Sequence, residues 1–120
     1  MAIQAITNAA LTAFNTTADF PAAVAASVAA DGVTIDATGR DDKLLIYIEN
    51  TDSVNAESAI IKKGNGIQAA NDLTVSLAAS AKKVIQLESG AFKNVSGTNK
   101  GKILIIPSST DVKFSAILMK

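Results

Sequence analysis

Residues 43–49 read Lys-Leu-Leu-Ile-Tyr-Ile-Glu, and this stretch decides the fold of the chain. Leu44, Ile46 and Ile48 occupy every second position, so an extended backbone places all three on one face of a strand. Branched and aromatic side chains of this kind suit a pleated surface. We therefore predict a central β-strand, which ends at the turn-forming residues 50–53, Asn-Thr-Asp-Ser.

The same alternation recurs along the chain between clusters of turn formers. Further strands are predicted at residues 58–63, 73–77, 82–88, 102–106 and 112–118, with a brief pairing at 91–93. The small residues 78–81 are expected to join two of these strands as a hairpin. Gly64-Asn65-Gly66 is expected to supply the positive φ angles of a tight turn or a bulge. Pro107 has no amide proton, so the chain must leave the sheet there or lie at its edge.

Seven to eight short strands at close spacing, with no helix-period segment between them, indicate an all-β fold. The class predicted is an antiparallel β-sandwich. Periodicity does not choose between a jelly-roll and an immunoglobulin-like arrangement, because both present alternating strands and Greek-key loops. A chain of 120 residues has the size of one domain and buries about two-thirds of its unfolded surface.

The chain changes character near residue 31. Residues 1–30 are rich in Ala and Thr and form an N-terminal arm or edge segment, whereas residues 31–120 form the sandwich domain. Pro21 followed by an Ala-rich run to residue 30 favours a short helix on propensity alone. Val24 and Val28 are the only sizeable apolar groups in that run, which favours an extended arm or edge strand instead. Both interpretations of residues 21–30 stay open.

Composition excludes several classes of partner. The 11 basic residues balance the 11 acidic ones, and no Arg-rich stripe is present, which argues against nucleic-acid and membrane binding. No apolar run approaches the roughly 18 residues of a membrane span, and residues 1–8 lack the pattern of a signal peptide. We expect a soluble protein that is made in the cytoplasm. Without cysteine, its stability must come from packing.

The residues that most enzymes depend on are missing. With no His and no Cys, the common general base, metal ligand and nucleophile are absent, so Ser-His-Asp, Cys-His and His-based zinc sites are excluded. A carboxylate pair would need a cleft, but the acidic residues lie mostly in predicted turns. We predict a protein that is no enzyme, with no catalytic, cofactor-binding or metal residues and no cofactor. The acidic residues that lie in predicted turns are Asp31, Asp36, Asp41, Asp42, Asp52 and Asp72.

Three local motifs have a functional and a structural interpretation. Arg40-Asp41-Asp42 with Asp36 offers clustered oxygens to calcium, but EF-hand spacing is absent and a charged turn is favoured. Lys62-Lys63-Gly64-Asn65-Gly66 resembles a phosphate loop without its order or following helix, so a hairpin turn is favoured. Asn15-Thr16-Thr17 and Asn94-Val95-Ser96 match the glycosylation pattern and are interpreted as chance matches.

The apolar residues point to packing and assembly. The five aromatic residues are too few for stacking platforms and are assigned mainly to the core: Phe14, Phe20, Tyr47, Phe92 and Phe114. Residues 44–48 and 103–106 are apolar on both faces of their strands. A two-layer sandwich buries only one face of each sheet, so a partner or further copies of the chain are expected to cover the other. This predicts an assembly component that forms a homo-oligomer.

Residues 43–93 resemble a family of small tailed-bacteriophage structural proteins. The resemblance is carried by Lys-Leu-Leu-Ile-Tyr-Ile-Glu-Asn-Thr-Asp at 43–52, Ile-Ile-Lys-Lys-Gly-Asn-Gly at 60–66, Asp-Leu-Thr-Val-Ser-Leu-Ala-Ala at 72–79 and Lys-Lys-Val-Ile-Gln-Leu-Glu-Ser-Gly-Ala-Phe-Lys at 82–93. It implies a β-sandwich virion protein that decorates or cements the head shell and contacts the major capsid protein or other virion proteins. A tail or head-fibre position falls within the same class. The chain departs from the family pattern at residues 40–42 and in its N-terminal third.

Two hypotheses about function follow. In the first, residues 1–30 add a strand to a neighbouring subunit or lie across it, and deleting them abolishes shell binding but leaves the fold intact. In the second, the chain is an immunoglobulin-like binding module that serves adhesion or glycan recognition through its loops.

Overall fold

The structure is a computed structural model that describes residues 3–38, 41–67, 69 and 71–119. Nearly all of its regular structure is β. The strands are β1 (Gln4–Ile6), β2 (Asn8–Ala10), β3 (Val24–Ala25), β4 (Val33–Asp36), β5 (Leu44–Asn50), β6 (Glu57–Ile61), β7 (Leu73–Leu77), β8 (Lys82–Ile85), β9 (Lys102–Pro107) and β10 (Val112–Leu118). The helical turns are η1 (Ala29–Asp31), η2 (Asp41–Lys43) and α1 (Ser89–Phe92).

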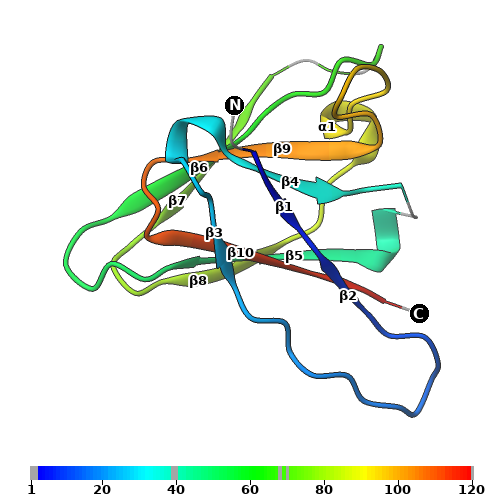
Figure 1. Cartoon of the computed structure of the whole chain (residues 1–120), viewed down its shortest axis with the longest axis horizontal. Coiled ribbons are helices and arrows are strands. Elements are labelled where there is room, and N and C mark those ends of the chain that lie inside the picture. Colours follow the sequence, from blue (N-terminus) through cyan, green and yellow to red (C-terminus); the bar gives the residue numbers. More distant parts are fainter. Residues whose placement is uncertain (1–2, 39–40, 68, 70, 120) are drawn as a thin grey trace.

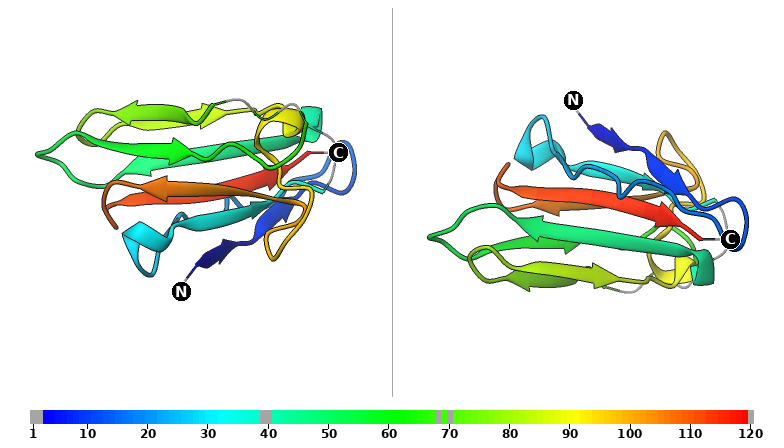
Figure 2. Two further views of the ribbon diagram at one scale, coloured as in Figure 1. Left: turned by 90° about the horizontal axis from the view of Figure 1, so that it is seen from above. Right: turned by 90° about the horizontal axis from the view of Figure 1, so that it is seen from below.

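The strands form two sheets that pack face to face (Figure 1). Sheet A has the order β1-β4-β9-β6-β7, and sheet B has the order β2-β10-β5-β8 with β3 also paired to β10. Figure 2 shows the N-terminal strands along one edge of the sandwich and β7 and β8 along the opposite edge. The all-β sandwich predicted from periodicity is therefore confirmed.

The order of pairing identifies the sandwich as a jelly roll. Strands β3 to β10 form four nested antiparallel pairs, β3 with β10, β4 with β9, β5 with β8 and β6 with β7. The chain thus resembles one long antiparallel ribbon that is rolled up, and the antiparallel contacts β5–β10 and β6–β9 close the roll. The topology selects the jelly roll over the immunoglobulin-like order that the sequence left open.

The core lies between the two sheets and is built mainly from alternate residues. Leu44, Ile46 and Ile48 are buried on the inner face of β5, as predicted from their spacing. Phe114 of β10 is the Cα partner of Ile48 and is completely buried among the side chains of both sheets. The alternation in residues 43–49 is therefore the signature of this inner face.

The N-terminal strands bring the count to ten within the described residues and make both sheets mixed. β1 and β2 pair in parallel with β4 and β10, outside the nested antiparallel set. Ile6 lies in the core, so the segment is anchored by a buried side chain as well as by backbone pairing. The prediction of seven to eight antiparallel strands missed β1 and β2, whose small residues carry little hydrophobic pattern, and it also missed the four-residue strand β4.

Residues 21–30 adopt the extended alternative. No α-helix begins at Pro21; the chain forms the short strand β3 and then the single 3₁₀ turn η1. Pairing of Val24 with Phe114, together with burial of Ala26 in the core, fixes this extended path. Tertiary pairing here overrides the helix propensity of alanine.

The hairpin predicted across residues 78–81 is wrong. β7 pairs with β6 in sheet A, whereas β8 pairs with β5 in sheet B, so this turn crosses from one sheet to the other. The buried Asn50 fixes the crossing: its Nδ2 donates to the Ala78 carbonyl oxygen at 3.1 Å, and its backbone amide donates to that of Ala81 at 2.9 Å. Small residues make this close passage sterically feasible.

Three expectations about local segments have different outcomes. Gly64 and Gly66 do not have positive φ angles; glycine is needed at 64 because a Cβ there would overlap the carbonyl oxygen of Lys93. Residues 89–92 form the turn of helix α1, where a brief strand pairing was expected at 91–93. The prediction for Pro107 is confirmed, since β9 ends at this residue.

Candidate docking surface

The most exposed long connection of the fold is residues 11–23, here named the arm. It links β2 to β3 and lies over the outer face of sheet B (Figure 1). β2 pairs with residues 116–118 of β10, and β3 pairs with residues 113–114, so the arm leaves one end of β10 and returns to the other. That return spans about 13 Å of strand, whereas its 13 residues reach about 43 Å when extended. The arm is therefore much longer than its connection requires.

One aromatic contact fastens the arm to the sheet. The rings of Phe20 and Tyr47 are 5.3 Å apart between centroids and nearly perpendicular, at 89°. Tyr47 lies on the outer face of β5, and its Cα partner Ser115 is buried although it points outward. A cavity of about 110 Å³ remains between the arm and the sheet, lined by Ala9, Leu11, Ala18, Asp19, Phe20, Pro21 and Ile117.

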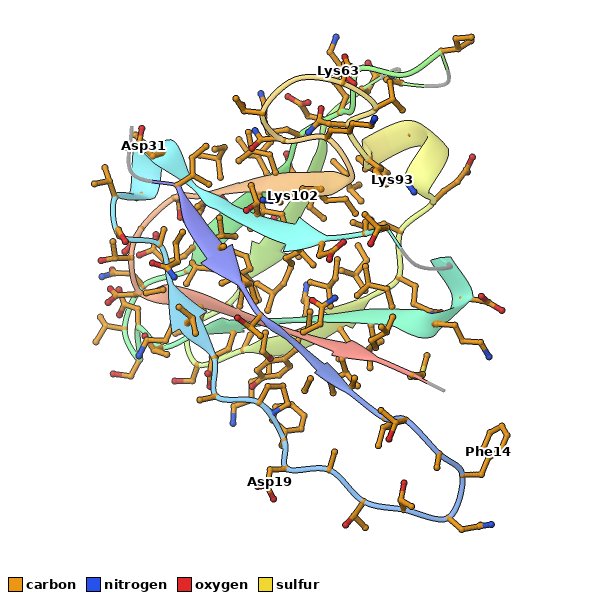
Figure 3. All side chains as sticks on the ribbon, turned by 45° about the vertical axis from the view of Figure 1, so that its right-hand side comes forward. Phe14, Asp19, Asp31, Lys63, Lys93 and Lys102 are labelled. Carbon is orange, nitrogen blue, oxygen red and sulfur yellow. The ribbon has the colours of Figure 1, made fainter. Side chains whose placement is uncertain are left out.

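Two large aromatic side chains of the arm are exposed. Phe14 is 76% exposed, and Phe20 remains 66% exposed despite its contact with Tyr47. Figure 3 shows Phe14 at the turn of the arm, pointing away from the sandwich. These two rings are exceptions to the prediction that most of the aromatic residues pack in the core, because the arm holds them outside both sheets. Exposed aromatic groups on a long connection are typical of a surface that binds another protein.

The strands that are apolar on both faces have different environments. In β5, the outward-facing Tyr47 is covered in part by Phe20 of the same chain. In β9, the outward-facing Leu104 and Ile106 are half-buried, and the neighbouring Ile60 is 36% exposed. A partner on this outer face of sheet A stays a prediction.

A second exposed apolar surface, here named the end patch, comprises Ile67 and Val95. Both side chains are exposed beside a groove of about 510 Å³ that also involves Asn65, Gly66 and Gly90. Asn65 holds the two loops together: its Oδ1 accepts from the Val95 amide at 2.7 Å, and its Nδ2 donates to the Ser96 carbonyl oxygen at 3.1 Å. The loops that carry the end patch lie on one side of the molecule, and the arm lies on the opposite side (Figure 1).

Residues 62–66, which resemble a phosphate loop in sequence, make contacts within the chain. Nζ of Lys62 forms a 2.8 Å ion pair with Asp72, and the Lys63 amide donates to the same carboxylate at 2.7 Å. These hydrogen bonds lower the pKa of Asp72, with that from the Lys62 side chain as the largest cause. The structural interpretation of this loop is therefore favoured, although the tight turn does not use positive φ angles.

In the described part of the chain, the residues of the calcium motif do not gather into one binding site, and the two glycosylation motifs lie in separate segments. The carboxylate of Asp36 accepts from the Thr38 amide at 2.9 Å and from its hydroxyl at 2.7 Å, and these bonds lower the pKa of Asp36. Arg40 lies outside the described residues. Asn15 lies in the arm at a φ of 62°, and the Asn94 side chain donates to the Lys102 carbonyl oxygen at 3.2 Å.

An acidic cluster that the sequence did not predict lies at one end of the sandwich. Carboxylate oxygens of Asp52, Glu57 and Asp111 come within 4.8 Å of one another. Backbone amides of Asn55 and Val54 donate to Asp52 and lower its pKa, and the Ser108 hydroxyl donates to Glu57 at 2.8 Å. Protein donors thus engage the carboxylates of Asp52 and Glu57, and we assign no ligand to the cluster. Asp111 lies more than 50 positions from Asp52 and Glu57 in the sequence, so no local motif joins the three.

The fold and these surfaces define the class: a jelly-roll domain that presents exposed apolar groups on an arm and at a loop end. No known protein family, curated protein or solved structure matches the chain. Across residues 3–38, 41–67, 69 and 71–119, no helix has the length and apolar character needed to cross a membrane. The resemblance to tailed-phage structural proteins stays a prediction.

Proposed function

We propose that the chain is a non-enzymatic virion structural protein of a tailed phage that decorates and stabilises the assembled head shell. It contacts the major capsid protein or other virion proteins through the arm. The observation that supports this proposal is the exposure of Phe14 and Phe20 on a connection far longer than the fold needs. Burying such rings against a partner contributes binding free energy without any catalytic group.

A decoration protein stabilises a shell when it binds the assembled state and not the free subunits. The arm and the end patch suit such a role because they lie on opposite sides of the molecule, so one chain can contact two neighbouring subunits. Once one surface is bound, the second binds at a high effective concentration, which strengthens the whole contact. Two weak surfaces therefore select an assembled lattice over single subunits.

The structure changes the deletion experiment that the sequence suggests. Removing residues 1–30 would also remove Ile6, which is 5% exposed, and Ala26, which is 3% exposed. Both belong to the core, so loss of binding would not be separable from loss of stability. Deleting residues 12–19 removes Phe14 and leaves five arm residues, which reach about 17 Å and still span the gap along β10.

The test is co-sedimentation with heads of the encoding phage that were assembled without this chain. We expect wild-type protein to pellet with the heads, and the Phe14→Ser variant and the 12–19 deletion to remain in the supernatant. Val54→Ser is the matched control, because Val54 is 81% exposed in the loop between β5 and β6, outside both surfaces. Wild-type binding by Phe14→Ser would contradict the role of the arm. Wild-type protein that ignores the heads but binds a glycan array would favour the binding-module hypothesis.

A further inference from the structure

Residues 4–10, which contain β1 and β2, are bound to the rest of the molecule in the manner of an added peptide. We name them the donor segment. Its backbone pairs in parallel with β4 and β10, and the Gln4 amide donates to the Gly32 carbonyl oxygen at 3.2 Å. Ile6 fills a place in the core, and Asn8 Nδ2 donates to the Asp36 carbonyl oxygen at 3.2 Å. All of these binding partners follow the arm in the sequence.

The remaining strands complete the roll without the donor segment. The four nested pairs from β3–β10 to β6–β7 involve neither β1 nor β2. The edges of β4 and β10 therefore form a preformed receptor for an extended strand, which is the geometry of β-strand addition. Two features select the strand that binds this receptor: the core space filled by the Ile6 side chain, and the parallel pairing with β4 and β10.

The arm is a tether long enough to place the donor segment on another molecule. Its 13 residues reach about 43 Å, which exceeds the longest dimension of the molecule, 39 Å. The contact of Phe20 with Tyr47 is a single edge-on ring pair, and both rings stay partly exposed. The arm can leave the sheet surface with little loss of buried area.

We propose that the donor segment exchanges between two copies of this chain, so that β1 and β2 of one copy occupy the β4 and β10 edges of the other. The exchanged dimer contains the same strand contacts as the closed monomer, so the balance depends on concentration. A flexible tether of this length holds its own segment at an effective concentration of roughly millimolar. The closed monomer therefore dominates in dilute solution, and exchange dominates where copies are crowded together. The inference does not depend on the proposed function.

The absence of cysteine makes a selective cross-linking test possible. Ala5 and Thr34 are Cα partners in the β1–β4 register. We would mix the single variants Ala5→Cys and Thr34→Cys, one of them labelled with ¹⁵N, warm them gently and oxidise. A disulfide between the two variants forms efficiently only when β1 of one chain lies on β4 of the other. We expect its yield to rise at least about tenfold between 10 µM and 1 mM protein.

Two controls make each result decisive. The double variant Ala5→Cys/Thr34→Cys must close within one chain in dilute solution; failure to close would overturn the pairing on which exchange rests. Ser58 and Ser76 are Cα partners in the β6–β7 pair, which cannot exchange without unrolling the sandwich. Mixed Ser58→Cys and Ser76→Cys chains measure random collision. A yield for the Ala5/Thr34 mixture no higher than this background at 1 mM would overturn the proposal.

Discussion

The ring of Phe20 stands edge-on to the ring of Tyr47, with centroids 5.3 Å apart and planes at 89°. This pair joins the arm, residues 11–23, to the outer face of sheet B, and the two residues are 27 positions apart in the sequence. Tyr47 is the only tyrosine and the chain has no tryptophan, so tyrosine emission reports on the surroundings of this one ring. The molecule therefore carries its own probe of arm docking.

Phe20→Ala is expected to detach the arm. We predict a change in Tyr47 emission and a loss of about 0.5–1 kcal/mol in the free energy of unfolding, since aromatic pairs contribute about this much. Urea titration and fluorescence measure both effects. Phe14→Ala is the matched control because Phe14 is a similarly exposed ring on the same arm and makes no ring contact within the described residues. Equal spectra for Phe20→Ala and wild type would show that the contact does not form in solution.

Asn50→Ala is expected to destabilise the crossing between the sheets. The buried Asn50 donates from Nδ2 to the carbonyl oxygens of Asn55 and Ala78, and its Oδ1 accepts from the Asp52 amide at 3.0 Å. Removing the side chain leaves these backbone groups without their partner, at a cost of about 1–3 kcal/mol. Chemical denaturation measures the loss. A change below about 0.5 kcal/mol would mean that water replaces these bonds.

Gly64→Ala and Gly66→Ala are expected to differ although both lie in one loop. A Cβ at Gly64 would overlap the Lys93 carbonyl oxygen, whereas the nearest atom to a Cβ at Gly66 is a methyl carbon of Val95 at 3.4 Å. We predict that Gly64→Ala lowers the free energy of unfolding by about 1–3 kcal/mol, as overpacking does. Gly66→Ala should change it by less than about 1 kcal/mol. Equal thermal stability of the two variants would contradict the close passage of the loops.

The stability contributed by Asp36 is expected to disappear in acid. The amide and hydroxyl of Thr38 donate to this carboxylate and lower its pKa below its ordinary value of 3.8. The folded chain therefore binds fewer protons than the unfolded chain near that pH. The contribution is complete above pH 3.8 and is lost as the pH falls through the folded-state pKa.

The measurement for Asp36 compares urea midpoints of wild type and Asp36→Asn between pH 7 and pH 2.5. The variant should be less stable at pH 7, and the difference should shrink in acid. Thr38→Ala is a graded control, since it removes the hydroxyl donor and keeps the backbone amide. A constant difference between wild type and Asp36→Asn over the whole range would contradict the assigned hydrogen bonds.

Much of the fold was predictable from local pattern. The alternation of Leu44, Ile46 and Ile48 correctly marked the inner face of β5, and the stop at Pro107 was correct. These features depend on the two-residue period of a strand and on the missing amide of proline, which are properties of the local chain.

The candidate docking surface was only partly predictable. The sequence separated residues 1–30 from the rest and left an edge strand open at residues 21–30. It missed β1 and β2, and it did not show that Phe14 and Phe20 are exposed on the arm. It also missed the cluster of Asp52, Glu57 and Asp111, because Asp111 comes from a segment more than 50 positions away from the other two. Surfaces made by distant segments have no local period to read.

The sequence by itself determined the class: an all-β chain without histidine or cysteine, whose strands carry one apolar face. Only the tertiary structure decided which strands are neighbours, that the 78–81 turn crosses between sheets and that the topology is a jelly roll. The physical reason is that alternation specifies which face of a strand is buried, whereas the choice of partner depends on packing of the whole roll. Turns such as the one held by Asn50 take their direction from contacts made far away in the sequence.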